Sequence, residues 1–196
     1  MQPELETYLD QLLSIRQDAD GLMSSLTDEQ FNWRPAPNRW SMCECFDHLN
    51  ITAEQLFIPR IDAAIADARR RGLTSAGPFV YPALQRLFLR MNEPPPKIRF
   101  KAPTILKPKL IRPLAAVHGD FLNWQDRLGE LIRQADGLDL QKARHRSLMP
   151  LWTWSLGTFM AVMLAHERRH IWQAREVRNA TGFPSARAGT TASTRL

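Results

Sequence analysis

A length of 196 residues favours a single domain that can bury a substantial core, and 44% apolar with 23% charged residues is the balance of an ordinary globular protein. No apolar run is long enough for a membrane span, so we expect no membrane partner. The N-terminus lacks the basic and apolar regions of a secretory signal, and only two cysteines are present, so we expect a cytoplasmic protein. The net charge of +6 comes without a basic stripe interleaved with aromatics and without helix-turn-helix or zinc-finger spacing, so we expect no nucleic-acid partner.

The chain begins with a predicted helix. Leucine and isoleucine at near-helical spacing indicate a helix over residues 3–26, and Thr27 is placed to cap a short helical turn after it. Residues 31–40 hold two prolines and two tryptophans, which indicates an ordered connector that packs its aromatic rings.

A second helix is expected from Ser41 to about Arg71. Ser41 is a good N-cap and Glu44 stands three residues later, which is the spacing of a capping box. Pro59 falls inside the helical pattern and is expected to kink or interrupt it. His48 lies beside the apolar stripe of this helix, so its side chain is expected to face the interior.

The remaining chain alternates irregular stretches with helices. Residues 72–110 are the least regular, with a helical turn expected over 83–91 and a long Pro-rich extended crossover after it. A third helix is expected over 113–135, and a fourth from Ser155, its N-cap, to about residue 179.

These elements predict an all-α fold with no convincing strands. The prediction is a four-helix bundle over residues 1–184, with the Pro-rich crossover between its second and third helices. Residues 185–196 are rich in Ala, Thr, Ser and Arg and are expected to form a disordered tail.

Two histidines on the last helix are the main chemical feature. His166 and His170 are four residues apart, about 40° around a helix, on a stripe that begins apolar. Buried imidazoles need partners, which are either hydrogen-bonding carboxylates and carbonyls or a divalent transition metal. His48 would add a third ligand, and three protein ligands with the other positions left to water are typical of a catalytic metal site. The sequence therefore predicts a candidate metal site of His48, His166 and His170, with hydrogen-bonded structural roles as the alternative.

The string over residues 166–170 also fits the H-E-x-x-H pattern of zinc peptidases, in which the glutamate is the general base. A peptidase of that kind has its third ligand downstream, yet the 26 residues after the motif hold no histidine and a single acidic residue, Glu176. We therefore expect Glu167, and also Gln173, to support the ligands from behind rather than to act as a base.

The other histidines and the cysteines are expected to have ordinary roles. His118 and His145 lie outside the two stripes and are predicted to be surface or polar-packing residues. Cys43 and Cys45 are about 200° apart on a helix, so they cannot hold one metal ion together. They are predicted to be buried packing residues, with a place for Cys45 in the pocket beside His48 as the alternative.

Three segments carry a family resemblance, in an order and spacing that extend over nearly the whole chain before the tail. They are Trp40-Ser41-Met42 leading to Asp47-His48-Leu49, then Leu89-Arg90-Met91-Asn92-Glu93-Pro94-Pro95 followed by Phe100-Lys101-Ala102-Pro103, then Leu156-Gly157-Thr158-Phe159 running into residues 166–173. Together they resemble the DinB-like (damage-inducible protein) metalloenzyme superfamily, which is related to the bacillithiol transferases and the mycothiol-dependent maleylpyruvate isomerases. Trp172 stands where that family often has a glycine, so the packing near the site is expected to differ.

The resemblance implies a bundle of up-down-down-up topology and a divalent metal held by three histidines, which map to His48, His166 and His170. It also implies relatives that resemble thiol S-transferases or isomerases, in which a low-molecular-weight thiol is activated on the metal. The leading hypothesis is a metal-dependent enzyme of the thiol S-transferase or hydrolase type that uses Zn²⁺ or Ni²⁺ on a small-molecule electrophile, with a homodimer as a candidate assembly. The alternative is a non-catalytic bundle that binds a metal or small ligand as a sensor or dimer scaffold, and an H-E-x-x-H zinc peptidase is the least favoured hypothesis.

Overall fold

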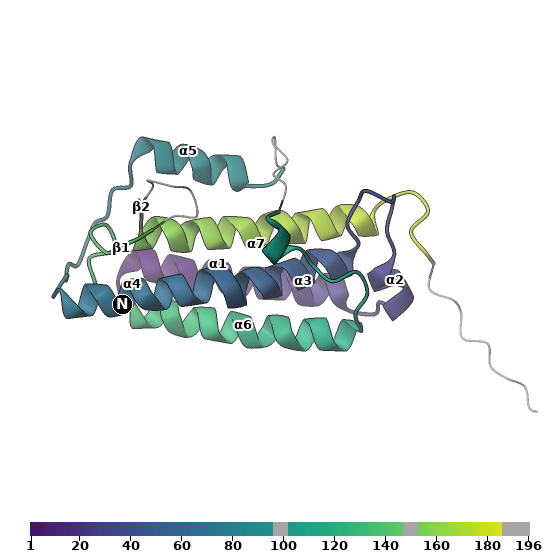
Figure 1. Cartoon of the computed structure of the whole chain (residues 1–196), viewed down its shortest axis with the longest axis horizontal. Coiled ribbons are helices and arrows are strands. Elements are labelled where there is room, and N and C mark those ends of the chain that lie inside the picture. The colour runs from purple at the N-terminus through teal and green to yellow at the C-terminus, as the bar shows by residue number, and fades with distance from the viewer. Residues whose placement is uncertain (96–101, 147–152, 186–196) are drawn as a thin grey trace, which may run out of the picture.

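The computed structural model describes residues 1–95, 102–146 and 153–185, and almost all of its regular structure is helical (Figure 1). The helices and strands are α1 (Pro3–Met23), α2 (Asp28–Asn32), α3 (Met42–Thr52), the π-helix η1 (Ala53–Phe57), α4 (Ile58–Arg70), α5 (Ala83–Asn92), the 3₁₀-helix η2 (Thr104–Leu106), α6 (Leu114–Gln134), β1 (Arg144–Arg146), β2 (Thr153–Ser155) and α7 (Leu156–Arg178). The predicted all-α fold class is confirmed. Within the described residues, no helix combines the length and apolar character needed to cross a membrane.

Capping side chains begin three of the helices where the sequence predicts them. Thr27, Ser41 and Ser155 each accept a hydrogen bond from the backbone N–H three residues later, which satisfies a donor that has no partner within the helix. The first helix ends three residues before its predicted end, because the chain leaves the helical region after Met23 and Ser25 adopts a φ of 64°.

The second long helix is interrupted in its middle by η1. The backbone N–H of Ile58 donates to the carbonyl of Ala53, five residues back, which is the wider turn of a π-helix. Pro59 follows directly and has no N–H to donate, so the regular hydrogen-bond ladder is broken where the sequence predicts an interruption.

Four long helical segments lie side by side in Figure 1: α1, the α3–η1–α4 segment, α6 and α7. Helix α3 packs against α6 and α7, and α1 packs against the same two helices, so the apolar faces of all four meet in the middle. The largest buried side chains include Phe31, Phe46 and Phe121, and the ring of Phe46 meets that of Phe121 edge-on at 5.5 Å. Helix α5 lies outside these four, against α7 (Figure 1).

A short antiparallel strand pair differs from the prediction of no strands. Strand β1 pairs with β2, with Arg144 opposite Ser155 and Arg146 opposite Thr153. Three residues per strand are too few to give an alternating pattern, which is why the sequence does not indicate them. The predicted disordered tail lies outside the described residues from residue 186 onward, as does the part of the predicted crossover over residues 96–101.

Candidate metal centre

The structure brings the three predicted histidines together between α3 and α7. One ligand nitrogen from each of His48, His166 and His170 lies within 4.8 Å of the others. The Nε2 atoms of His48 and His166 are 3.2 Å apart, and the ring centroids of His166 and His170 are separated by 4.6 Å. Three imidazole nitrogens converging in this way could hold one metal ion.

The tautomer of His48 is fixed by a backbone group. Its Nδ1 lies 2.7 Å from the carbonyl oxygen of Leu106, which can only accept a hydrogen bond, so Nδ1 carries the proton. The lone pair of His48 is therefore on Nε2, the atom that faces His166. A carbonyl behind the ring is the usual partner of a metal-ligating histidine.

The other two histidines have no comparable partner behind the ring. Among the described residues, the Nδ1 atoms of His166 and His170 are buried and accept or donate no hydrogen bond. The alternative prediction, that buried carboxylates or carbonyls satisfy the imidazoles, is thus met for His48 by the Leu106 carbonyl and in part for His170 by a side-chain hydrogen bond with Gln173. The feature that favours a set of metal ligands is therefore the convergence of the three rings, and not the partners behind them.

Aromatic rings enclose the cluster. The indole of Trp40 is stacked on His170 at a centroid distance of 5.8 Å and lies 5.0 Å from the ring of His48. Phe57, the last residue of η1, lies 5.5 Å from the ring of His166. These rings limit the rotation of the imidazoles and keep much of the surrounding water away.

Burial keeps the three imidazoles neutral. It lowers the pKa of His48, with the Leu106 carbonyl and Asp47 acting in the opposite direction. It lowers the pKa of His166 and of His170 still further, and the neighbouring histidines and Arg169 add to the effect. Neutral imidazoles at pH 7 have free lone pairs, so a metal would not have to displace protons.

The side chain of Glu167 contacts helix α6. Its carboxylate is buried and accepts a hydrogen bond of 2.8 Å from Nε2 of Gln125 on α6. Burial raises the pKa of Glu167 to about 7, while Gln125 and Arg168 oppose the change. Within the described part of the chain, Glu167 does not belong to the group of converging ligand atoms, so the geometry gives the general-base role of the peptidase motif no support.

Gln173 lies close to the cluster, and its side chain interacts with His170 in the direction that raises the pKa of that imidazole. Trp172, next to it, is half-buried. The contact of Gln173 with His170 is compatible with support of that ligand from behind, while the hydrogen bond of Glu167 runs to Gln125, and the supporting roles of both residues stay a prediction.

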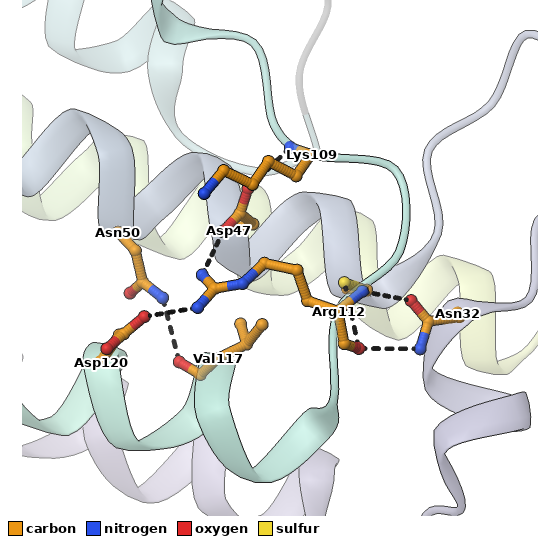
Figure 2. A network of polar contacts seen from close by, with 8 residues as sticks. Asn32, Asp47, Asn50, Lys109, Arg112, Val117 and Asp120 are labelled. Carbon is orange, nitrogen blue, oxygen red and sulfur yellow. Dashed lines mark hydrogen bonds and ion pairs between the residues drawn. The ribbon is translucent and has the colours of Figure 1, made fainter.

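The sequence did not reveal a buried ion pair beside the cluster. Asp47, the residue before His48, has a side chain only 1% exposed and accepts a hydrogen bond of 2.6 Å from Nη1 of Arg112 (Figure 2). Its second oxygen accepts from the backbone N–H of Lys109 at 2.7 Å. An acidic residue among apolar neighbours on α3 is the one sequence signal for this pair, since a buried carboxylate requires a partner.

The remaining predicted residues have the expected ordinary roles where they are described. Nε2 of His118 lies 2.7 Å from Oδ1 of Asp20 in a partly exposed contact. Cys43 and Cys45 are free and buried, and burial raises the pKa of both thiols, that of Cys43 to about 11. The prediction for the side chain of His145 lies outside what the structure describes.

Comparisons with known proteins identify the family. No curated protein and no solved structure matches the chain. A family model described as the DinB superfamily matches residues 11–174, a range that contains α3, the crossover and all three clustered histidines. The chain therefore belongs to the DinB superfamily.

Proposed function

We propose that this protein is a metal-dependent enzyme of the thiol S-transferase or hydrolase type. In this proposal His48, His166 and His170 hold one divalent transition metal, Zn²⁺ or Ni²⁺. The observation that carries it is the convergence of ligand nitrogens from three imidazoles to within 4.8 Å, two of them from buried residues and one from the half-buried His166, in a chain of this superfamily. Imidazole suits both metals, and three protein ligands leave coordination positions for water or substrate.

The donor set determines the chemistry that such a site can support. A divalent metal held there would lower the pKa of a bound water or thiol and so make a nucleophile available at neutral pH. The chain's own contribution is to present Nε2 of His48 through the Leu106 carbonyl and to surround the site with Trp40 and Phe57. Gln173, whose side chain interacts with His170, would stabilise the orientation of that ligand, and Glu167 would support α7 through its hydrogen bond with Gln125. The proposed substrates are a small-molecule electrophile and a low-molecular-weight thiol.

We also infer that the helices form a four-helix bundle of up-down-down-up topology over residues 1–184. The chain colours in Figure 1 support it, because α1 and α7 run in one direction while the α3–α4 segment and α6 run in the other. The long connection from α4 to α6, which includes α5, then joins two parallel members of the bundle. Assembly as a homodimer stays a prediction.

Metal content tests the proposal directly. The protein, purified without a nickel column, is expected to contain about one equivalent of metal per chain by mass spectrometry. His48→Ala and His166→Ala are each expected to lose it, while His118→Ala, which changes a partly exposed histidine paired with Asp20, is expected to retain it. A folded, metal-free protein whose melting temperature does not respond to added Zn²⁺ would rule the proposal out.

The second candidate is a non-catalytic bundle that binds a metal or small ligand. It is favoured by one observation: the carboxylate of Glu167, the residue after His166, is hydrogen-bonded to Gln125 on α6 and is not among the converging ligand atoms. Turnover separates the two, because tight metal binding without thiol transfer or hydrolysis over a broad substrate panel would favour the non-catalytic bundle. The peptidase hypothesis requires peptide cleavage that Glu167→Gln abolishes, and a wild-type protein that cleaves no peptide removes it.

A further inference from the structure

Two adjacent side chains of α3 hold the end of the crossover that leads into α6. His48 donates from Nδ1 to the carbonyl of Leu106 at 2.7 Å. Asp47 accepts from the backbone N–H of Lys109 at 2.7 Å and from the guanidinium of Arg112 at 2.6 Å (Figure 2). The same short segment therefore contacts both a proposed metal ligand and the residue before it.

This segment has almost no apolar attachment of its own. Leu106 is buried, but no side chain over residues 107–113 is, and Leu110 and Ile111 are 65% and 79% exposed. Polar contacts must therefore hold these residues in place. The main ones are those of Asp47, together with Asn32, which exchanges hydrogen bonds of 3.2 and 2.9 Å with the backbone of Arg112 (Figure 2).

The contacts of Asp47 are strong enough for that role. Its buried carboxylate has one oxygen on a backbone N–H and the other on a guanidinium, so the cost of burial is offset by a charge-assisted pair. Nη2 of the same guanidinium lies 2.9 Å from Oδ2 of Asp120, which is 46% exposed. A solvent-exposed pair of that kind is weak, so the Asp47 side of Arg112 is the side that fixes the segment.

We propose that Asp47 and Arg112 are positioning residues for the ligand His48. They fix the segment that presents the Leu106 carbonyl, and that carbonyl selects the tautomer of His48 with its proton on Nδ1 and its lone pair on Nε2, toward His166. Without that carbonyl, a neutral imidazole exchanges between two tautomers. The tautomer with its proton on Nε2 directs an N–H, and no lone pair, at the proposed metal site. The inference rests on the proposed function to the extent that His48 binds the metal.

Asp47 and Asp120 contact the same guanidinium, that of Arg112, so substituting each of them in turn gives a matched pair of variants. Asp47→Asn removes the charge on the inner side of Arg112, and Asp120→Asn removes it on the outer side. In competition with a chromophoric chelator, the Kd of Asp47→Asn for Zn²⁺ is expected to rise about tenfold, the lower end of the effect of outer-shell partners on metal affinity. Asp120→Asn is expected to bind Zn²⁺ as the wild type does.

A general loss of stability would not change the tautomer of His48, so the tautomer tests the positioning role specifically. In the metal-free protein with ¹⁵N-labelled histidine, long-range ¹H–¹⁵N correlation is expected to show His48 protonated on Nδ1 in the wild type and in Asp120→Asn. In Asp47→Asn, a mixture of both tautomers is expected. If Asp47→Asn does not fold, Arg112→Lys serves instead, because lysine keeps the charge but cannot contact both carboxylates in the same geometry.

The two readouts separate this inference from the proposed function. Unchanged Zn²⁺ affinity and an unchanged tautomer in Asp47→Asn, or in Arg112→Lys where that variant takes its place, would overturn the positioning role. A wild type that binds no Zn²⁺, while the variant shows the tautomer change, would contradict the proposed function and leave the control of His48 by Asp47 standing. A Zn²⁺-binding wild type whose variant keeps the tautomer would overturn the positioning role alone.

Discussion

At the scale of single residues, burial determines which groups near the cluster carry charge. The three imidazoles have lowered pKa values mainly because burial disfavours their charged form. The metal-free fold therefore loses stability as the pH falls below about 6.5, where unfolded histidine binds protons that the folded chain does not. Glu167 acts in the opposite direction, because burial raises the pKa of its carboxyl to about 7.

Glu167→Gln should make the metal-free protein more stable at alkaline pH. The folded-state pKa of about 7 lies above the ordinary value of 4.5, so the wild type loses stability as the pH rises between the two. The full difference corresponds to about 3 kcal/mol. Glutamine can still accept the hydrogen bond from Gln125 but cannot ionise. The free energy of unfolding of the variant is therefore expected to exceed that of the wild type by up to about 3 kcal/mol at pH 8 and by little at pH 4.

Urea unfolding at the two pH values, with chelator present, measures this effect. The histidines contribute equally to both proteins, so their pH dependence cancels in the comparison. Glu130→Gln, which changes an exposed glutamate paired with Arg127 on α6, is the control and is expected to show no such pH-dependent gain. The same stability difference between Glu167→Gln and wild type at pH 4 and pH 8 would contradict the burial argument.

At the scale of elements, the start of α3 determines where Trp40 and His48 stand. Ser41 and Glu44 form a full capping box, with hydrogen bonds of 3.1 and 3.0 Å between each side chain and the other's backbone N–H. Glu44 also accepts from Nε of Arg34 at 2.6 Å, which attaches the preceding connector to the helix. The cap thus joins the turn that holds Trp40 to the helix that holds His48.

Ser41→Ala is expected to lower the free energy of unfolding by about 1 kcal/mol, because it leaves the N–H of Glu44 without its acceptor. Thermal or urea unfolding measures the loss. Ser24→Ala, which removes an exposed hydroxyl that donates to the Gly21 carbonyl just after α1, is the control and is expected to stay within about 0.5 kcal/mol of wild type. Equal effects of the two serine variants would show that the cap does not stabilise α3.

At the scale of the whole molecule, the histidine cluster exists only when α3 and α7 are packed together. His48 comes from one helix and the other two histidines from a helix more than 100 residues later. A metal that binds only this packed form stabilises the entire fold by mass action, without any change in the core.

Added Zn²⁺ should therefore raise the melting temperature of the metal-free protein. At a free Zn²⁺ concentration about 100-fold above Kd, the free energy of unfolding is expected to rise by about 2.7 kcal/mol. For a chain of this length, that corresponds to a melting temperature higher by about 5 to 10 °C. His170→Ala is expected to show a much smaller rise under the same conditions. An equal rise in wild type and His170→Ala would mean that Zn²⁺ binds elsewhere.

The sequence by itself determined most of the helices and the residues of the histidine cluster. Helical periodicity, the caps at Thr27, Ser41 and Ser155 and the interruption at Pro59 are local signals, and each lies where the structure has it. The histidine cluster was also predictable, because two imidazoles four residues apart share a helix face whatever the tertiary structure is.

Only the tertiary structure decided which partners those residues have. The Leu106 carbonyl reaches His48 across 58 residues of sequence, Arg112 reaches Asp47 across 65, and Glu167 faces Gln125 and not the cluster. None of these pairings leaves a periodic trace in the sequence, because each depends on how the crossover and the helices pack. The short β1–β2 pair was also missed, because three residues per strand are too few to give an alternating pattern.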